Sequence, residues 1–146
     1  MCGGTGVLGA YLVPRLGERG HAGTGLARAD AKAAQVAAMG ATAVPGDMLD
    51  RASLARAAEG AEVVIHGATR IPRVFPGRPA DFAPNDRVRR DGTRNLLDAA
   101  AAAGVRRFVL QSIIWVHGDQ QDAWIDEEAT LRPTAVARSA VDAEAL

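Results

Sequence analysis

The sequence predicts an α/β fold in which a doubly wound parallel sheet lies between two layers of helices. Three observations lead to this prediction. A glycine-rich turn at residues 3–9 passes at once into a helical pattern, and short apolar segments then alternate with helical ones. Such alternation is typical of βαβ units with right-handed crossovers. The length of 146 residues fits one domain with a real hydrophobic core.

The glycine turn is the first candidate site. Glycine tolerates a positive φ and lets a phosphate approach the backbone closely. The helix that follows offers unpaired N–H groups and the positive end of its dipole to an anion, and a dinucleotide pyrophosphate is held in this way. No Gly-Lys-Ser or Gly-Lys-Thr follows, which argues against a Walker-type loop, although a glycine-rich turn alone is also compatible with an ordinary loop. The residues expected to hold the cofactor here are Gly3, Thr5, Gly6, Val7, Leu8 and Gly9.

The other helices and strands are predicted from the spacing of apolar residues, from helix-capping residues and from glycines and prolines that interrupt regular structure. Glycines are expected to end several of the helices, and Pro14 is expected to kink the first one or shift its register. The Pro- and Arg-rich stretch 69–84 is expected to be irregular, and loops of this length often cover a site. Residues 113–132 also have the composition of a loop. We expect helices over 7–19, 31–39, 85–103 and 133–146, and strands over 22–27, 41–44, 62–66 and 106–112. A further helix that ends at 58 is expected to be capped by Asp50 or Ser53.

Composition narrows the class of protein. Seventeen basic and seventeen acidic residues balance to zero, which argues against general nucleic-acid binding. The single cysteine excludes an internal disulfide and is compatible with a reducing cytoplasm. No apolar run approaches the roughly 18 residues that span a bilayer, and no signal peptide is readable. We therefore expect a soluble cytoplasmic protein without a nucleic-acid or membrane partner.

Residues after the second and third expected strands are candidates for the adenosine end of a dinucleotide. Arg28 suits the 2′-phosphate of NADP, whereas the nearby Asp30 keeps NAD open. Asp47 can accept a hydrogen bond from an adenine amino group while Met48 packs on the ring. The alternative is a simple turn aspartate at position 47.

Other polar residues have both a chemical and a structural interpretation. Ser112 ends the last clear strand, at the edge where open α/β sheets bind ligands, but no Gly-x-Ser-x-Gly elbow surrounds it. His66 is interpreted as a packed histidine, and the three histidines lack metal-ligand spacing. The arginines between residues 70 and 94 are interleaved with acids, which indicates a solvated face, with an anionic substrate pocket as the alternative.

Together these motifs resemble the short-chain dehydrogenase/reductase superfamily, and most closely its extended and atypical branch, the NAD-dependent epimerase/dehydratase family. The resemblance implies a Rossmann-type NAD(P)-binding domain, with Gly67, Ala68 and Thr69 passing on the ribose side of the cofactor. The segments that carry it are Gly-Gly-Thr-Gly-Val-Leu-Gly at 3–9, Gly-Asp-Met-Leu-Asp at 46–50, Val-Val-Ile-His-Gly-Ala-Thr at 63–69, Asn85 with Gly-Thr-Arg-Asn-Leu-Leu-Asp-Ala-Ala at 92–100, and Val-Arg-Arg-Phe-Val-Leu-Gln-Ser at 105–112.

The sequence departs from this family at the catalytic machinery. The family's usual active-site serine falls on Ile113, and its Tyr-x-x-x-Lys falls on Val136 and Ala140. Neither valine nor alanine can transfer a proton. The only tyrosine is Tyr11, in the first helix. If hydride chemistry survives, the nearby polar candidates are Ser112 and His117.

The resemblance implies the following expectations. The chain is an NAD(P)-binding domain of an atypical epimerase/dehydratase-like oxidoreductase acting on a carbonyl, hydroxyl or nucleotide-sugar substrate. The preference for NADP over NAD comes from Arg28 itself. The alternative is a non-catalytic dinucleotide-binding regulator or scaffold. Relative to the family, the first strand is largely missing and the C-terminal substrate lobe is absent. A homodimer through helices 85–103 and 133–146 is also implied.

Overall fold

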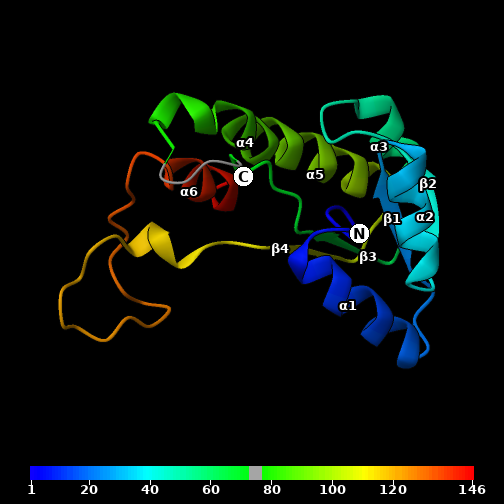
Figure 1. The fold of residues 1–146 in the computed structure, drawn as a ribbon, viewed down its shortest axis with the longest axis horizontal. Coiled ribbons are helices and arrows are strands. Elements are labelled where there is room, and N and C mark those ends of the chain that lie inside the picture. Colours follow the sequence, from blue (N-terminus) through cyan, green and yellow to red (C-terminus); the bar gives the residue numbers. More distant parts are fainter. Residues whose placement is uncertain (73–76) are drawn as a thin grey trace.

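The computed structural model describes residues 1–72 and 77–146. Helices and strands alternate through the first two thirds of the chain, as Figure 1 shows. The helices are α1 (Val7–Glu18), α2 (Asp30–Ala38), α3 (Arg51–Ala58), α4 (Ala83–Arg87), α5 (Thr93–Ala102) and α6 (Arg138–Glu144). Shorter helical segments are η1 (Pro79–Phe82), η2 (Val88–Gly92) and η3 (Ile114–His117).

The strands are parallel and form one continuous arrangement. β1 (Thr24–Ala27) pairs with β2 (Thr42–Pro45), and β3 (Val63–His66) pairs with β4 (Arg107–Leu110). Residues 1–2 join the two pairs, because Leu26 donates its N–H to the Met1 carbonyl and Cys2 donates to the Ile65 carbonyl. The spatial order is therefore β2, β1, residues 1–2, β3, β4. Residues 1–2 therefore occupy the position between β1 and β3, directly in front of the glycine turn.

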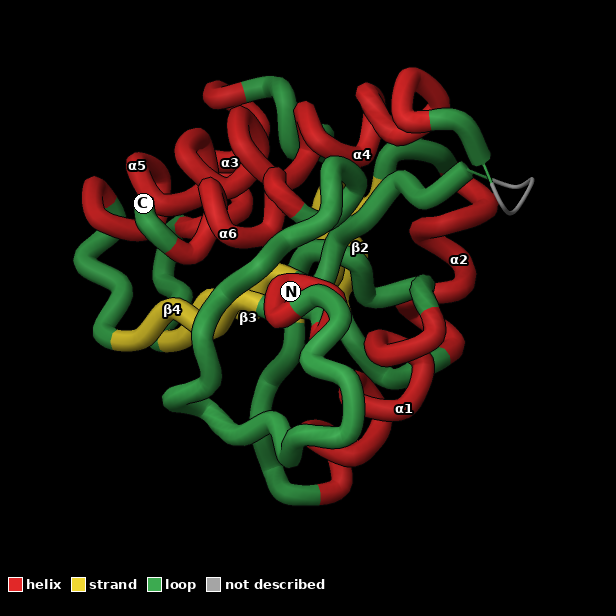
Figure 2. The backbone as a smooth tube through the Cα atoms, turned by 90° about the vertical axis from the view of Figure 1, so that its left-hand side faces the viewer, coloured by secondary structure: helices red, strands yellow, loops and turns green. Residues whose placement is uncertain are grey.

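Two hydrophobic clusters cover the two faces of the sheet. On one face, Val13 of α1 and Val36 of α2 pack with Ala41. On the other face, Leu54 of α3 and Leu96 of α5 belong to a larger cluster that includes Cys2 and Val64. Figures 1 and 2 show the same division, with α1 on one side of the strands and α3, α4 and α5 on the other. The predicted doubly wound α/β fold is confirmed.

The helix expected over 85–103 contains a break in its hydrogen-bond pattern. It begins earlier, as α4, and changes to π-helical turns in η2 before α5 continues to Ala102. Glycines end four helices as expected, since positive φ values follow α1, α2, α3 and α5 at Gly20, Gly40, Gly60 and Gly104. α1 continues through Pro14.

The last helix was predicted too early. It begins at Arg138 instead of 133, after a turn in which the Thr134 carbonyl accepts from the N–H groups of Ala137 and Arg138. Arg132 is held away from helical geometry because it precedes a proline and donates its N–H to the Val116 carbonyl. The expected loop 113–132 contains the short helix η3, and the expected strand 106–112 is trimmed to β4.

The remaining differences are small. The strands expected over 22–27, 41–44 and 62–66 have four residues each, and α2 starts and ends within one residue of the expected helix 31–39. Of the two expected caps of the third helix, Asp50 is the N-cap of α3. Part of the expected irregular stretch 69–84, namely 73–76, lies outside the described residues. Within 1–72 and 77–146, no helix is both long and apolar enough to cross a membrane.

Candidate functional site

The glycine turn is fixed by contacts that only glycine permits. Gly3 has a φ of 83°, and a Cβ added to it would lie 2.5 Å from the carbonyl carbon of Gly67. A Cβ on Gly9 would lie 2.3 Å from the Gly4 carbonyl oxygen. Real Cβ atoms do not approach backbone so closely, so the turn packs backbone against backbone. Its shape is therefore set by the residue type itself.

The start of α1 is open to a ligand. Its N-cap is Gly6, which provides no side-chain hydrogen bond to the first turn. Within the described residues, no acceptor outside the helix is bonded to the N–H groups of Val7, Leu8 and Gly9. The Val7 side chain is 86% exposed, so water reaches this end of the helix. Free N–H groups at a glycine turn fit the pyrophosphate of a dinucleotide.

The segment after β3 lies directly beside this turn. Gly67 donates its N–H to the Cys2 carbonyl at 3.0 Å, and a Cβ on Gly67 would contact Leu8 at 3.6 Å. Ala68 donates its N–H to Nδ1 of His66 at 3.2 Å, whereas Thr69 is exposed. The structure therefore places 67–69 next to the glycine turn.

His66 is a buried neutral imidazole at the end of β3. Its side chain is 2% exposed. Burial is the main reason that its pKa falls to about 4, and the Arg89 guanidinium lowers it further while the Val88 backbone acts in the opposite direction. An imidazole with this pKa is uncharged at neutral pH, which fits its role as acceptor of the Ala68 N–H.

A hollow of about 330 Å³ lies at the carboxyl ends of β1 and β2. Arg28, Asp30, Asp47 and Asp50 are among its lining residues. Arg28 forms a 3.7 Å ion pair with Asp47, and both side chains are well exposed. Carboxyl ends of strands are where open α/β sheets bind ligands. The two residues predicted for the adenosine end are thus brought together in one hollow.

Asp47 is also an organiser of its own turn. Its Oδ1 accepts the Leu49 N–H at 2.8 Å, and its backbone N–H donates to Ser53 Oγ at 3.1 Å. Met48 is 6% exposed and packs in the core, where a Cβ on Gly92 would lie 3.2 Å from its Cβ. In this structure Met48 does not present its side chain to the hollow.

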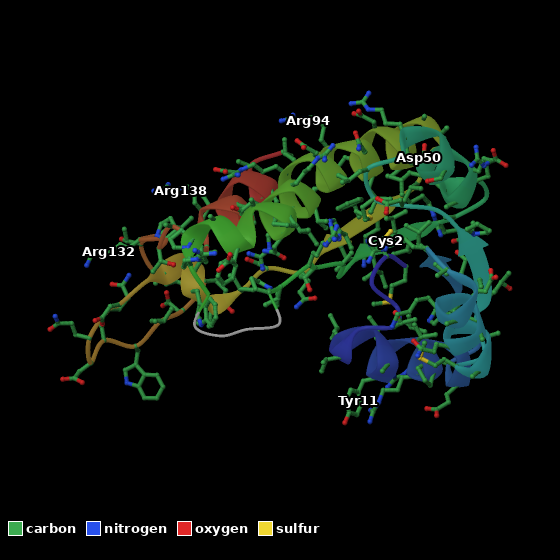
Figure 3. The ribbon with its side chains drawn as sticks, turned by 45° about the horizontal axis from the view of Figure 1, so that its top comes forward. Cys2, Tyr11, Asp50, Arg94, Arg132 and Arg138 are labelled. Carbon is green, nitrogen blue, oxygen red and sulfur yellow. The ribbon has the colours of Figure 1, made fainter. Side chains whose placement is uncertain are left out.

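The two predicted catalytic residues follow β4 in the chain, and no hydrogen bond joins them within the described residues. Ser112 is exposed and donates its hydroxyl to Oε1 of Glu144 in α6. His117 ends η3, and its buried Nδ1 has no hydrogen-bond partner within the described residues. Tyr11 is 68% exposed on α1, away from this end of the sheet (Figure 3).

Comparison with known proteins agrees with this geometry. The model of the NAD(P)H-binding family matches residues 3–145. The chain belongs to this family. A Streptomyces 3-diazoavenalumate denitrifying reductase is 38% identical over 133 residues, which cover 90% of this chain and 42% of that protein. The chain thus spans less than half the length of this curated relative.

Two solved structures are similar across almost the whole chain. One is a short-chain dehydrogenase/reductase superfamily protein from Agrobacterium tumefaciens with bound NAD, with 28% identity and a TM-score of 0.80 over 99% of this chain and 42% of that one. The other is a dTDP-glucose 4,6-dehydratase from Streptomyces venezuelae with NAD bound, with 26% identity and a TM-score of 0.78 over 99% and 48%. The resemblance to the epimerase/dehydratase branch of this superfamily is confirmed, and the domain is an NAD(P)-binding one.

One buried charge in this NAD(P)H-binding domain was missed in the sequence. Arg89 is 7% exposed, although the arginines of 70–94 were interpreted as a solvated face. A signal was present, because Asn85, Arg89, Thr93 and Leu96 recur at helical spacing, and all four are buried. These four residues form one buried face of the helix, and Arg89 therefore points toward the interior of the protein.

Proposed function

We propose that this chain is the cofactor-binding part of an oxidoreductase that binds NADPH in preference to NADH and acts on a small carbonyl or hydroxyl substrate. The observation that carries the proposal is the glycine cradle. Gly3 and Gly9 leave no room for a Cβ, and the first N–H groups of α1 open beside 67–69. The bound cofactor would supply the hydride.

The chain's own residues would hold the cofactor from two sides. The N–H groups of Val7, Leu8 and Gly9 would bind the pyrophosphate, and Arg28 would meet the adenosine ribose end in the hollow. A guanidinium suits a 2′-phosphate because it can donate two parallel hydrogen bonds. The hollow also contains Asp30 and Asp47, which favour the free 2′-hydroxyl of NADH. Arg28 forms a 3.7 Å ion pair with Asp47. The preference for NADPH requires that Arg28 leave this ion pair and bind the 2′-phosphate of the cofactor.

Ser112 is the residue best placed to orient a substrate oxygen. Its proton is directed to Glu144, so its oxygen lone pairs can accept a hydrogen bond from a substrate hydroxyl. Its exposure leaves it accessible at the carboxyl edge of the sheet. In the oxidation of an alcohol, the hydroxyl proton would pass by way of Ser112 Oγ to the Glu144 carboxylate as the hydride leaves for the bound cofactor, and the reduction of a carbonyl would run the same transfers in reverse.

The cofactor proposal is tested by calorimetric titration of NADPH and NADH into the chain, the Arg28→Ala variant and an Arg56→Ala control on the exposed side of α3. We expect NADPH to bind more tightly than NADH and Arg28→Ala to weaken NADPH by about tenfold, since a charged hydrogen bond contributes about 1.5–3 kcal/mol. NADH should be little affected. Equal losses for both nucleotides would contradict the phosphate role of Arg28.

A non-catalytic dinucleotide-binding protein is the second candidate. Val136 and Ala140 stand where the family resemblance places the tyrosine and lysine, and Ala140 is 3% exposed inside the chain. NADPH oxidation in the presence of a panel of aldehydes and ketones separates the two. Turnover that Ser112→Ala reduces supports the oxidoreductase, and tight NADPH binding without turnover supports the regulator or scaffold.

We also propose a homodimer through the α5 and α6 regions, as the family resemblance implies. Ala99 and Ala100 of α5 and Ala140 and Ala143 of α6 are already buried within the chain. The dimer would therefore use the exposed side of α5, where Ala101 and Ala102 lie. Light scattering after size exclusion tests this, and a monomer mass at all concentrations would contradict it.

A further inference from the structure

Arg89 is the one buried charged side chain within the described residues. It belongs to η2, the π-helical segment between α4 and α5. π-Helical turns are rare and occur often at functional sites. The segment η2 packs against α6.

The guanidinium of Arg89 has donors without acceptors. Within the described residues, no side chain or carbonyl accepts a hydrogen bond from it, and no carboxylate forms an ion pair with it. Asp86 and Glu144 act on it only through space. Both acids already have closer donors, since Ser139 donates to Asp86 Oδ1 at 2.6 Å and Ser112 donates to Glu144.

The guanidinium of Arg89 is largely buried, and only the long-range attraction of two acids offsets its lost hydration. Burial lowers the pKa of Arg89, while the two acids raise it. A guanidinium remains charged at neutral pH and has five N–H donors. Buried charges are normally paired, because an unpaired one loses its hydration without compensation. A ligand oxyanion would provide that compensation.

The N–H groups of Arg89 lie at the end of the site formed by the carboxyl ends of β3 and β4, which we call the reactive end. The adenosine hollow lies on the other side of the sheet order, at β1 and β2. Asn85, one helical turn before Arg89 on the same buried face, accepts the Arg70 N–H at 2.9 Å, so this face lies beside the segment that follows β3. His66 is followed by Gly67, which contacts the glycine turn. Arg28 lies instead at the end of β1, beside β2. The two arginines therefore serve different parts of a bound complex.

We propose that Arg89 binds the carboxylate of an anionic substrate beside the nicotinamide end of the cofactor. The inference rests on the proposed function, because that function places a cofactor and a substrate at this edge. The planar guanidinium matches a carboxylate with two parallel hydrogen bonds. Asp86 and Glu144 would oppose a dianionic phosphate more strongly than a singly charged carboxylate.

The test uses benzoate as the anionic probe and benzamide as its neutral counterpart. Both are titrated at millimolar concentrations into the chain, Arg89→Gln, Arg89→Lys and the matched control Arg94→Gln, with and without saturating NADPH. Arg94 is exposed and lies little more than one helical turn further along the chain (Figure 3). Thermal melting of each variant confirms that it is folded.

We expect benzoate to bind the unmodified chain and Arg94→Gln, and Arg89→Gln to weaken it about tenfold or more. Arg89→Lys should lie between, because it keeps the charge but loses the planar fork. Benzamide should bind weakly to every variant. The proposal would be overturned if the unmodified chain did not bind benzoate, or if Arg89→Gln bound benzoate as tightly as the unmodified chain does.

The two proposals fail in different ways. NADPH binding without benzoate binding would reject the carboxylate site and leave the cofactor assignment standing. Benzoate binding that depends on Arg89 without NADPH binding would do the reverse. If Arg89→Gln weakened NADPH and left benzoate unchanged, the anion would be a cofactor phosphate, and the carboxylate assignment would be wrong.

Discussion

The two ends of the candidate site are built from different parts of the chain. At the glycine turn, the shape is made by backbone, because Gly3 and Gly9 exclude any side chain. At the reactive end, it is made by side chains from separate elements, such as Ser112 after β4 and Glu144 in α6. The shape of a site made by backbone can be predicted from the residue types of one short segment. The shape of a site made by side chains depends on contacts between residues that are far apart in the sequence. The two ends should therefore respond differently to substitution.

The largest expected effect is at the backbone end. Gly3→Ala should lower the free energy of unfolding by about 3 kcal/mol and abolish or weaken NADPH binding by about 100-fold, because a Cβ at this positive φ collides with Gly67. Gly17→Ala in α1 is the control, since nothing lies within 4 Å of its Cβ position. This change should raise stability by about 0.5–1 kcal/mol. Thermal melts and NADPH titration measure both, and equal behaviour of the two variants would contradict the steric account.

A loss of stability of similar size, confined to low pH, is expected at His66, where the two ends meet. Its folded pKa is about 4, below the unfolded value of 6.5. As the pH falls below 6.5, the unfolded chain takes up a proton that the folded chain excludes, so stability present above this pH is lost toward pH 4. The loss is roughly 3 kcal/mol for this group. Urea unfolding across this range should show it in the unmodified chain and in His21→Gln, but not in His66→Gln.

The same histidine reports on Arg89. Because the guanidinium contributes to the lowered pKa of His66, Arg89→Gln should raise that pKa, and NMR titration of the imidazole measures the change. An unchanged His66 pKa would mean that the Arg89 charge is not felt at the end of β3.

The smallest of these effects is expected at the reactive end. Ser139 is fully buried and donates to Asp86 at 2.6 Å. Ser139→Ala should lower stability by about 1–2 kcal/mol because a hydrogen bond to a charged group is lost. NADPH affinity should not change, since the glycine turn is untouched. A large loss of NADPH affinity would show that the two ends are coupled.

The sequence predicted the fold and the tight packing of the glycine turn better than the contacts among side chains at the reactive end. Local rules cover the glycine turn, and short β-branched runs such as 63–66 predict buried parallel strands. The start of α6 was missed because Arg132 is held by a carbonyl in η3, a contact between elements that no local pattern predicts. Met48 was predicted to pack on the adenine ring. Its side chain packs in the core instead, close to Gly92, which has no side chain to occupy that space. Arg89 was hidden because arginines are usually exposed.

The central claim is that the first N–H groups of α1 bind the cofactor pyrophosphate. The most direct measurement is an amide NMR titration of the ¹⁵N-labelled chain with NADPH. We predict that the largest shifts occur at Val7, Leu8 and Gly9 and at 67–69, with little change in 119–131. Saturable NADPH binding that leaves the amides of residues 7–9 unshifted would contradict the account.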